Sequence, residues 1–261
     1  MTDLFEEVEE QLRSDRYREL ARKALPWVLA LAAVALVAAL GVWGWQQYRL
    51  QVTNKASEAY NAGLEAQARG DLAQSAKLMT DAANAGSKAY KSLALMQLGA
   101  LKLAAGSPAD VKQAVAYFEQ AANAAPDDVL GDAARLKSAL AILDTAPFVE
   151  VEGRLAPLLK QGRPYAVQAR EALAFAKLLK GDEKGARADF VVIQGSLDAP
   201  DSARQRAGAA ISLIDSGSAK MVAPTVKAEL AMPTPMMVAP GGQPIAPPSG
   251  QAPAPEAPPQ Q

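Results

Sequence analysis

An uncharged apolar segment near the amino terminus most constrains what this chain can fold into. Residues 24–48 read ALPWVLALAAVALVAALGVWGWQQY and contain no Asp, Glu, Lys or Arg. At a rise of about 1.5 Å per residue, a helix of this length spans the roughly 30 Å hydrocarbon core of a bilayer. Trp27 lies at one end and Trp43, Trp45 and Tyr48 at the other, where interfacial aromatic residues are expected. The sequence therefore predicts a transmembrane helix over residues 24–48.

Two other interpretations of this segment remain open, namely a buried helix of a soluble protein and a cleaved signal peptide. A buried helix rarely lacks charge around its whole circumference. A signal peptide has a shorter apolar region, and cleavage near Ala39 would leave an apolar, Trp-rich new terminus. Pro26 fits an anchor that begins at residue 24, because the missing N–H of proline costs least in the first helical turn. A permanent anchor is favoured over both alternatives.

Basic residues flank the predicted anchor unevenly. Arg49 and Lys55 follow it closely. Those that precede it are Arg13, Arg16, Arg18, Arg22 and Lys23. The positive-inside rule then places residues 1–23 in the cytoplasm and everything after the anchor outside. This amino-terminal stub has Leu4, Val8 and Leu12 at helical spacing, which predicts a short amphipathic helix. A solvated helix is favoured over a docking surface for another membrane component.

The region 49–217 is predicted to be an all-α, tetratricopeptide-like solenoid of paired antiparallel helices. It is Ala-rich, punctuated by Gly, Asn, Asp and Pro, and has no alternating β-branched runs that would indicate strands. Three segments share a small residue in a first helix, a turn, and a large apolar residue in a second helix. The small residues are Gly63, Gly99 and Ala174, and the large ones are Met79, Phe118 and Phe190. The small residues would let paired helices approach closely, and the large ones would fill the space between pairs.

A further pair of helices is predicted between the second and the last of these segments, in a register that the sequence does not fix. Its first helix would point Leu136, Leu140 and Leu143 inward, and its second would be interrupted at Pro157. A final helix over about residues 201–215 would cap the array, since terminal repeats need a polar outer face. A plain helical bundle is the alternative architecture.

The segment 218–261 is rich in Pro, Ala, Met and Gln and has almost no charge. Such a composition cannot bury a core, so the segment is predicted to be a disordered tail with polyproline II character. A flexible tail is favoured over a ligand for a proline-reading partner.

A solenoid of helix pairs presents its first helices on a concave face, where such arrays hold peptides. The predicted registers place nine residues on that face: Tyr60, Leu64, Gln67, Met96, Ala100, Leu103, Glu171, Phe175 and Leu178. For the apolar members, an ordinary core position between helices is the alternative. Residues 49–217 hold 20 Lys plus Arg and 19 Asp plus Glu, so an apolar or mixed peptide is a better ligand than a strongly charged one.

The composition argues against several functional classes. The chain has no Cys and no His, which removes thiolate and imidazole chemistry, including the commonest metal ligands. Lys plus Arg total 27 against 28 for Asp plus Glu, which gives no general electrostatic case for nucleic acid. Glu150 with Glu152, or Asp182 with Glu183, would be the carboxylates of an enzyme, but adjacent acids on turns are usually solvated. We expect no enzyme, cofactor or small-molecule substrate.

The order of these parts resembles a known family. The anchor ends in GVWGWQQY and is followed by DAARLKSALAILD, GRLAPLL, REALAFAKLLKGD and ARADF. Over residues 1–216 the chain resembles the tetratricopeptide-like ancillary subunits of the SecYEG translocon, while the Pro-rich tail departs from the family. The resemblance implies a single-pass bacterial inner-membrane protein with a periplasmic domain. It also implies Sec translocon components, periplasmic chaperones and exported polypeptides as partners. An adaptor for cell-envelope assembly or division is the alternative function.

Overall fold

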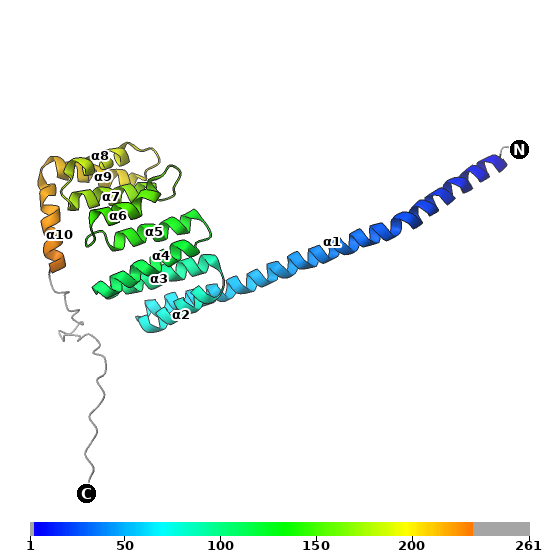
Figure 1. Cartoon of the computed structure of the whole chain (residues 1–261), viewed down its shortest axis with the longest axis horizontal. Helices are drawn as coiled ribbons and strands as arrows, with labels where there is room; N and C mark the ends of the chain where they lie inside the picture. The colour runs from blue at the N-terminus through cyan, green and yellow to red at the C-terminus, as the bar shows by residue number, and fades with distance from the viewer. Residues whose placement is uncertain (1–2, 232–261) are drawn as a thin grey trace, which may run out of the picture. The chain divides into compact units, whose positions relative to one another are not determined.

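The computed structural model describes residues 3–231, and side chains from residue 25 onward. The described part of the chain is all-α (Figure 1), which confirms the predicted fold class. The chain divides into two units, Met1–Ala172 and Leu173–Gln261, and each is described here by itself.

The first unit begins with one unbroken helix, α1 (Asp3–Ala68), of 66 residues. It contains the helix predicted for the stub, the predicted anchor and the first helix of the first repeat, with no turn between them. Pro26 therefore lies inside α1, and its predicted place in a first turn is wrong. The reason is that the residues before it, rich in Glu, Arg, Leu and Ala, are strong helix formers that extend the helix toward the amino terminus.

The apolar part of α1 is exposed in the structure. Helix α1 over Leu25–Ala68 is long and apolar enough to cross a membrane, with a mean hydropathy of 2.4 in its most apolar window and none of that window buried. Trp27 is 79% exposed and Leu31 75% exposed. The buried-helix alternative requires these side chains to be covered, and they are exposed instead. The signal-peptide alternative stays open, because a signal sequence also has an apolar helix of this length and composition.

The remainder of the first unit consists of antiparallel helix pairs (Figure 1). The end of α1 pairs with α2, α3 pairs with α4, and α5 pairs with α6 and a short 3-10 helix, η1. Their bounds are α2 (Leu72–Asn84), α3 (Lys88–Ala105), α4 (Pro108–Ala124), α5 (Asp128–Ala141), α6 (Phe148–Leu155) and η1 (Ala156–Leu159). Helix α6 ends just before Pro157, which lies in η1, as the sequence predicted.

Two Gly-Asp turns have the same geometry and confirm the predicted repeat. Gly70 and Gly181 adopt φ of 82° and 86°, a left-handed conformation that favours glycine. The following aspartates then cap the next helices. The Asp71 carboxylate accepts a hydrogen bond from the Gln74 backbone N–H at 3.0 Å. The Asp182 carboxylate accepts one from the Gly185 N–H at 2.9 Å.

The core of the first unit depends on small residues that face large ones. Phe118 is 2% exposed and lies so close to Gly99 that a Cβ atom on this glycine would be 2.6 Å from the phenyl ring. Gly63 has the same relation to Met79, at 2.9 Å. The Ser92 hydroxyl also donates a buried hydrogen bond to the Ala121 carbonyl, which joins α3 to α4. Gly63 and Gly99 thus allow the close approach of paired helices that the sequence predicted, and Met79 and Phe118 pack against them within the same pair.

A buried carboxylate fixes the chain that follows η1. Asp132 of α5 is completely buried and accepts hydrogen bonds from the Arg163 Nε at 2.7 Å, from the Arg163 Nη2, and from the Arg135 Nη1 at 3.0 Å. Arg163 also pairs with Asp128 at 2.7 Å. The hydrogen bond to Asp132 raises the pKa of Arg163 above its usual range, and the charges of Asp132 and Asp128 add to this effect. Burial acts in the opposite direction but is outweighed. A buried charge is tolerated only with such partners.

Helix α7 (Ala166–Leu179) begins in the first unit and ends in the second, which continues with α8 (Glu183–Gly195) and α9 (Asp201–Asp215). The bounds of α9 agree with the final capping helix predicted over residues 201–215. Phe190 is completely buried and meets the ring of Phe175 edge-on at 5.3 Å. Arg187 donates two hydrogen bonds to Asp215, at 2.7 and 3.0 Å, and this partner lowers the pKa of the Asp215 carboxyl.

The predicted start of the tail at Ser218 is wrong. A 3-10 helix, η2 (Ser218–Met221), and α10 (Val222–Ala231) follow Gly217. The residues of α10 include helix-forming Ala, Lys, Glu and Leu, and its single proline, Pro224, lies in the first turn, where it breaks no intrahelical hydrogen bond. Residues 232–261 of the predicted tail lie outside the described residues.

The contact between Gly99 and Phe118 predicts opposite effects for two identical substitutions. Gly99→Ala should lower the free energy of unfolding by about 1–3 kcal/mol, because the new methyl group collides with a fixed ring. Gly153→Ala should raise it by about 0.5–1 kcal/mol, because this helical glycine has open space around it. Urea unfolding of the detergent-solubilised chain, followed by circular dichroism, measures both. Equal effects of the two substitutions would contradict the packing.

Candidate functional site

A groove lies between the first helices of two successive pairs, α3 and α5. Its volume is about 460 Å³. The lining residues are Ala100, Leu103 and Ala104 of α3, Phe118 of α4, and Lys137, Leu140 and Ala141 of α5. All except Lys137 are apolar. This is the face on which helical-repeat solenoids hold peptides.

The groove follows from helical spacing in both walls. Each wall contributes residues at positions i, i+3 and i+4, which share one face of a helix. In α3 these are Ala100, Leu103 and Ala104. In α5 they are Lys137, Leu140 and Ala141. The alanine side chains are short and leave the groove open, and the two leucine side chains are partly exposed to solvent.

Exposure distinguishes the groove from the core. Leu103 is 37% exposed and Leu140 is 46% exposed, although both are large and apolar. Phe118, in contrast, is almost fully buried and belongs to the core between α3 and α4. The groove therefore offers apolar side chains to a ligand and has a rigid aromatic residue behind them.

The structure brings together two of the nine predicted face residues in this groove, Ala100 and Leu103. Leu140 was expected to point inward, and that prediction is wrong: it forms the opposite wall. Its spacing of four residues from Leu136 suggested one common buried stripe. Leu136, at 8% exposure, is buried, but the neighbouring helices do not cover Leu140.

The predicted residues of α1 lie near α3. Tyr60 and Leu64 are partly buried and pack against the core of the first unit. The Tyr60 ring lies 5.7 Å from that of Tyr90, and its hydroxyl accepts a hydrogen bond from the Gln97 side chain at 3.3 Å. Gln67 is half-buried farther along α1. Tyr60 and Leu64 thus have the core role that was the alternative for apolar members of the face.

Two of the predicted face residues are buried in the structure and must be corrected. Met96 is 8% exposed and is part of the core cluster of α2, α3 and α4. Leu178 is 3% exposed, one turn beyond the buried Ala174 in α7. Glu171 is half-buried, and Phe175 is 38% exposed with its edge-on contact to Phe190.

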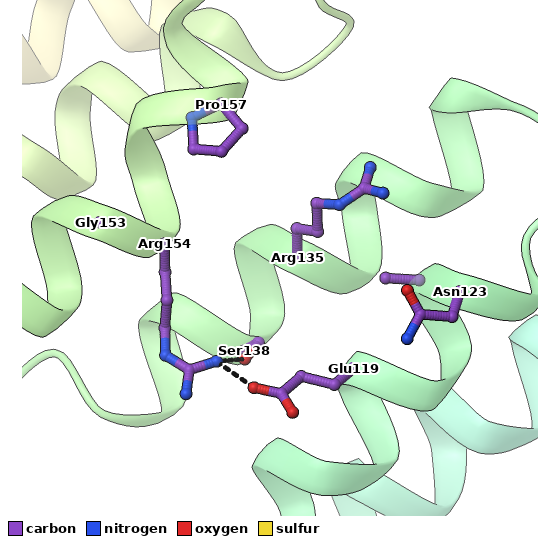
Figure 2. A pocket seen from close by; sticks show the side chains of 8 residues that line it. Glu119, Asn123, Arg135, Ser138, Gly153, Arg154 and Pro157 are labelled. Carbon is purple, nitrogen blue, oxygen red and sulfur yellow. Dashed lines mark hydrogen bonds and ion pairs between the residues drawn. The ribbon is translucent and has the colours of Figure 1, made fainter.

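A second hollow lies between α4, α5 and α6, and Figure 2 shows its lining. Its volume is about 280 Å³. The Arg154 Nη1 donates hydrogen bonds to Glu119 at 2.5 Å and to the Ser138 hydroxyl at 2.9 Å (Figure 2). Its Nη2 donates to Glu150 at 3.3 Å. Burial acts to lower the pKa of Arg154, but the two carboxylates outweigh it and raise that pKa.

These contacts give the second hollow a structural role. One guanidinium group joins three helices, and its charge is already balanced by Glu119 and Glu150. The groove between α3 and α5 is larger, and its one charged lining residue is the exposed Lys137. We therefore take the α3–α5 groove as the candidate binding site.

The acids considered for catalysis have other contacts. Glu150 pairs with Arg154 in α6, and Asp182 caps α8. Within the described residues, no group of three His, Cys, Asp or Glu side chains is arranged to hold a metal ion.

The comparisons with known proteins give one match. A model of the tetratricopeptide repeat-like domain matches residues 23–157. This range contains the predicted anchor, the first two helix pairs, α5 and α6 of the third pair, and the whole α3–α5 groove. No curated protein and no solved structure matches the chain.

Truncation of two predicted face residues should separate the core from the groove. Met96→Ala should lower the free energy of unfolding by about 2–5 kcal/mol, because it leaves a cavity. Leu103→Ala should change it by less than about 1 kcal/mol, because that side chain is already partly in water. Thermal unfolding of the two variants in one detergent provides the comparison. A loss at Leu103 as large as that at Met96 would show that the groove wall is part of the core.

Proposed function

Because the chain belongs to the tetratricopeptide repeat-like domain family, we propose that it is a membrane-anchored, non-catalytic protein-interaction module that holds apolar peptide segments in the α3–α5 groove. The observation that carries the proposal is the pair of partly exposed leucines, Leu103 and Leu140, in facing helix walls with the rigid Phe118 behind them. An extended or helical peptide with apolar side chains would bury these leucines and Phe118's remaining surface.

The finer proposal concerns the partners. We infer that the protein is an accessory of the Sec translocon that connects exported chains with periplasmic chaperones. Its support is the sequence resemblance of residues 1–216 and the uneven basic residues around the anchor. Newly exported chains are unfolded and expose apolar segments, which suits a groove with little charge. The anchor would raise the effective concentration of a weak site beside a membrane channel without adding any contact.

The location belongs to the same proposal. Helix α1 would cross the bacterial inner membrane once, with residues 1–23 in the cytoplasm and the helix pairs in the periplasm. The exposed apolar surface of Leu25–Tyr48 supports the membrane crossing. The five basic residues before it support the direction.

Labelling of single cysteines tests the location, because the chain has no cysteine of its own. A membrane-impermeant maleimide added to spheroplasts should label Arg69→Cys, at the far end of α1, without lysis. Ser14→Cys should react only after lysis, because it precedes the anchor. The opposite pattern would reverse the proposed orientation. Labelling of Arg69→Cys in a soluble, shortened chain would support the signal-peptide alternative.

Photocrosslinking in intact membranes tests the groove and its partners together. A photoreactive residue at Leu103 or Leu140 should capture exported polypeptides, and translocon or chaperone subunits should be recovered with the complex. Val149, which is 76% exposed on α6 and outside the groove, is the matched control. Equal adducts from Val149 would contradict a specific groove. Adducts from Leu103 and Leu140 that contain only factors of envelope assembly or division would favour that alternative function.

A further inference from the structure

The continuity of α1 fixes the distance between the membrane and the repeats. The helix runs without a break from the apolar segment, which ends at Tyr48, to Ala68 in the first pair. Helix α2 packs back along α1 in the opposite direction, so the turn between α2 and α3 returns toward the membrane (Figure 1). This turn consists of residues 85–87.

Two contacts show which residues of α1 lie beside this turn. Gly86 lies against Val52, since a Cβ atom on this glycine would be 3.2 Å from Val52 Cγ1. The Tyr90 hydroxyl donates a hydrogen bond to the Ser57 hydroxyl at 2.9 Å, one turn farther from the membrane. Val52 comes only four residues after Tyr48, which is about 6 Å along a helix axis.

That distance is comparable with the thickness of the headgroup layer. A bilayer has a hydrocarbon core of about 30 Å within a total of about 40–45 Å, which leaves about 5–7 Å of headgroups on each side. The α2–α3 turn therefore lies at the outer edge of the headgroups. Lysine and arginine side chains at this level reach the lipid phosphates, because their long stems extend toward the interface.

The charged side chains nearest the anchor are basic. Residues 49–57 of α1 and residues 82–90 around the turn contain Arg49, Lys55 and Lys88, and no Asp or Glu. All three basic residues are exposed. We call them the juxtamembrane basic patch. The nearest acids are Glu58, three residues after Lys55 on α1, and Asp81 of α2, and both line one hollow with Lys55.

We propose that the α2–α3 turn and the juxtamembrane basic patch rest on the membrane surface and bind the phosphates of anionic lipids. The proposal depends on the proposed anchor, because the level of the turn is counted from the end of the membrane segment. It adds a second interaction surface that is separate from the groove. Contact at the turn would restrict the tilt of α1 and hold the first helix pairs in one orientation toward the bilayer.

A fluorescent probe on a single cysteine tests the position of the turn. The full chain is reconstituted into vesicles of phosphatidylcholine, alone or with an equal part of phosphatidylglycerol, that contain a headgroup-attached nitroxide quencher. Asn84→Cys places the probe at the exposed end of α2, beside the turn. Arg69→Cys is the matched control at the other end of the first pair, about 30 Å along α1 from Tyr48. We expect strong quenching at position 84 and little at position 69.

Charge reversal tests the lipid preference. Each basic residue near an anionic surface strengthens attraction about fivefold, so quenching at position 84 should be stronger with phosphatidylglycerol and weaker at high salt. Lys55→Glu with Lys88→Glu should abolish the phosphatidylglycerol dependence. Lys77→Glu with Lys112→Glu makes the same change in net charge at exposed positions outside the patch and should preserve the dependence.

The outcomes separate this proposal from the anchor on which it rests. If the chain is released from membranes by alkaline carbonate, the anchor itself is disproved. If it stays in the membrane but the probes at positions 84 and 69 are quenched equally, the surface contact is disproved. If quenching at position 84 changes neither with the phosphatidylglycerol content nor with the substitutions in the juxtamembrane basic patch, the phosphate contact is disproved.

Discussion

The rest of this structure depends on the unbroken hydrogen bonding of α1 between Tyr48 and Ala68. A flexible linker at this point would leave the repeats free to move relative to the apolar segment. Instead, the helix that carries the apolar side chains also supplies the first helix of the first pair. Every residue that packs on its carboxyl-terminal part, Gly86 and Tyr90 included, is thereby fixed at a level along the axis of α1. Residues 49–57 contain no Gly or Pro, and α2 and α3 cover one side of the helix, which explains its continuity.

The groove depends on the same contacts that hold the first unit together. Phe118 fits against α3 only because position 99 has no side chain, and this close approach sets the distance between α3 and α4. The ring is then both a core residue and the back of the groove. Ala100, Ala104 and Ala141 give no bulk to the walls, so the space beside the ring remains open. Stability and the proposed peptide binding would thus share one aromatic side chain, whereas Leu103 and Leu140 would contribute to binding at little cost in stability.

Local sequence signals predicted the helices and turns well, and they predicted the outward faces less well. The Gly-Asp turns, the Gly99 and Phe118 pair and the final helix over residues 201–215 each have a local cause in spacing or capping. The exposure of a residue on a first helix depends instead on how closely the next pair approaches. Met96, Ala100 and Leu103 share a stripe on α3, yet only the last two line the groove. Leu136 is buried and Leu140 is exposed, although the two lie four residues apart on α5. In the predicted tail, the prolines obscured a helical segment whose only proline is in its first turn.

The net charge of this chain does not show how its charged side chains are distributed in the fold. The whole chain is nearly neutral, with 27 Lys plus Arg and 28 Asp plus Glu. The juxtamembrane basic patch nevertheless combines Arg49, Lys55 and Lys88 from two segments that are more than thirty residues apart, and Glu58 and Asp81 lie beside Lys55. Sequence statistics average over this separation, whereas electrostatic attraction decays within about 10 Å and responds only to the nearest charges. The groove and the patch would therefore use different chemistry on the same unit: apolar contact for a peptide, and charge for the membrane to which α1 would tie it.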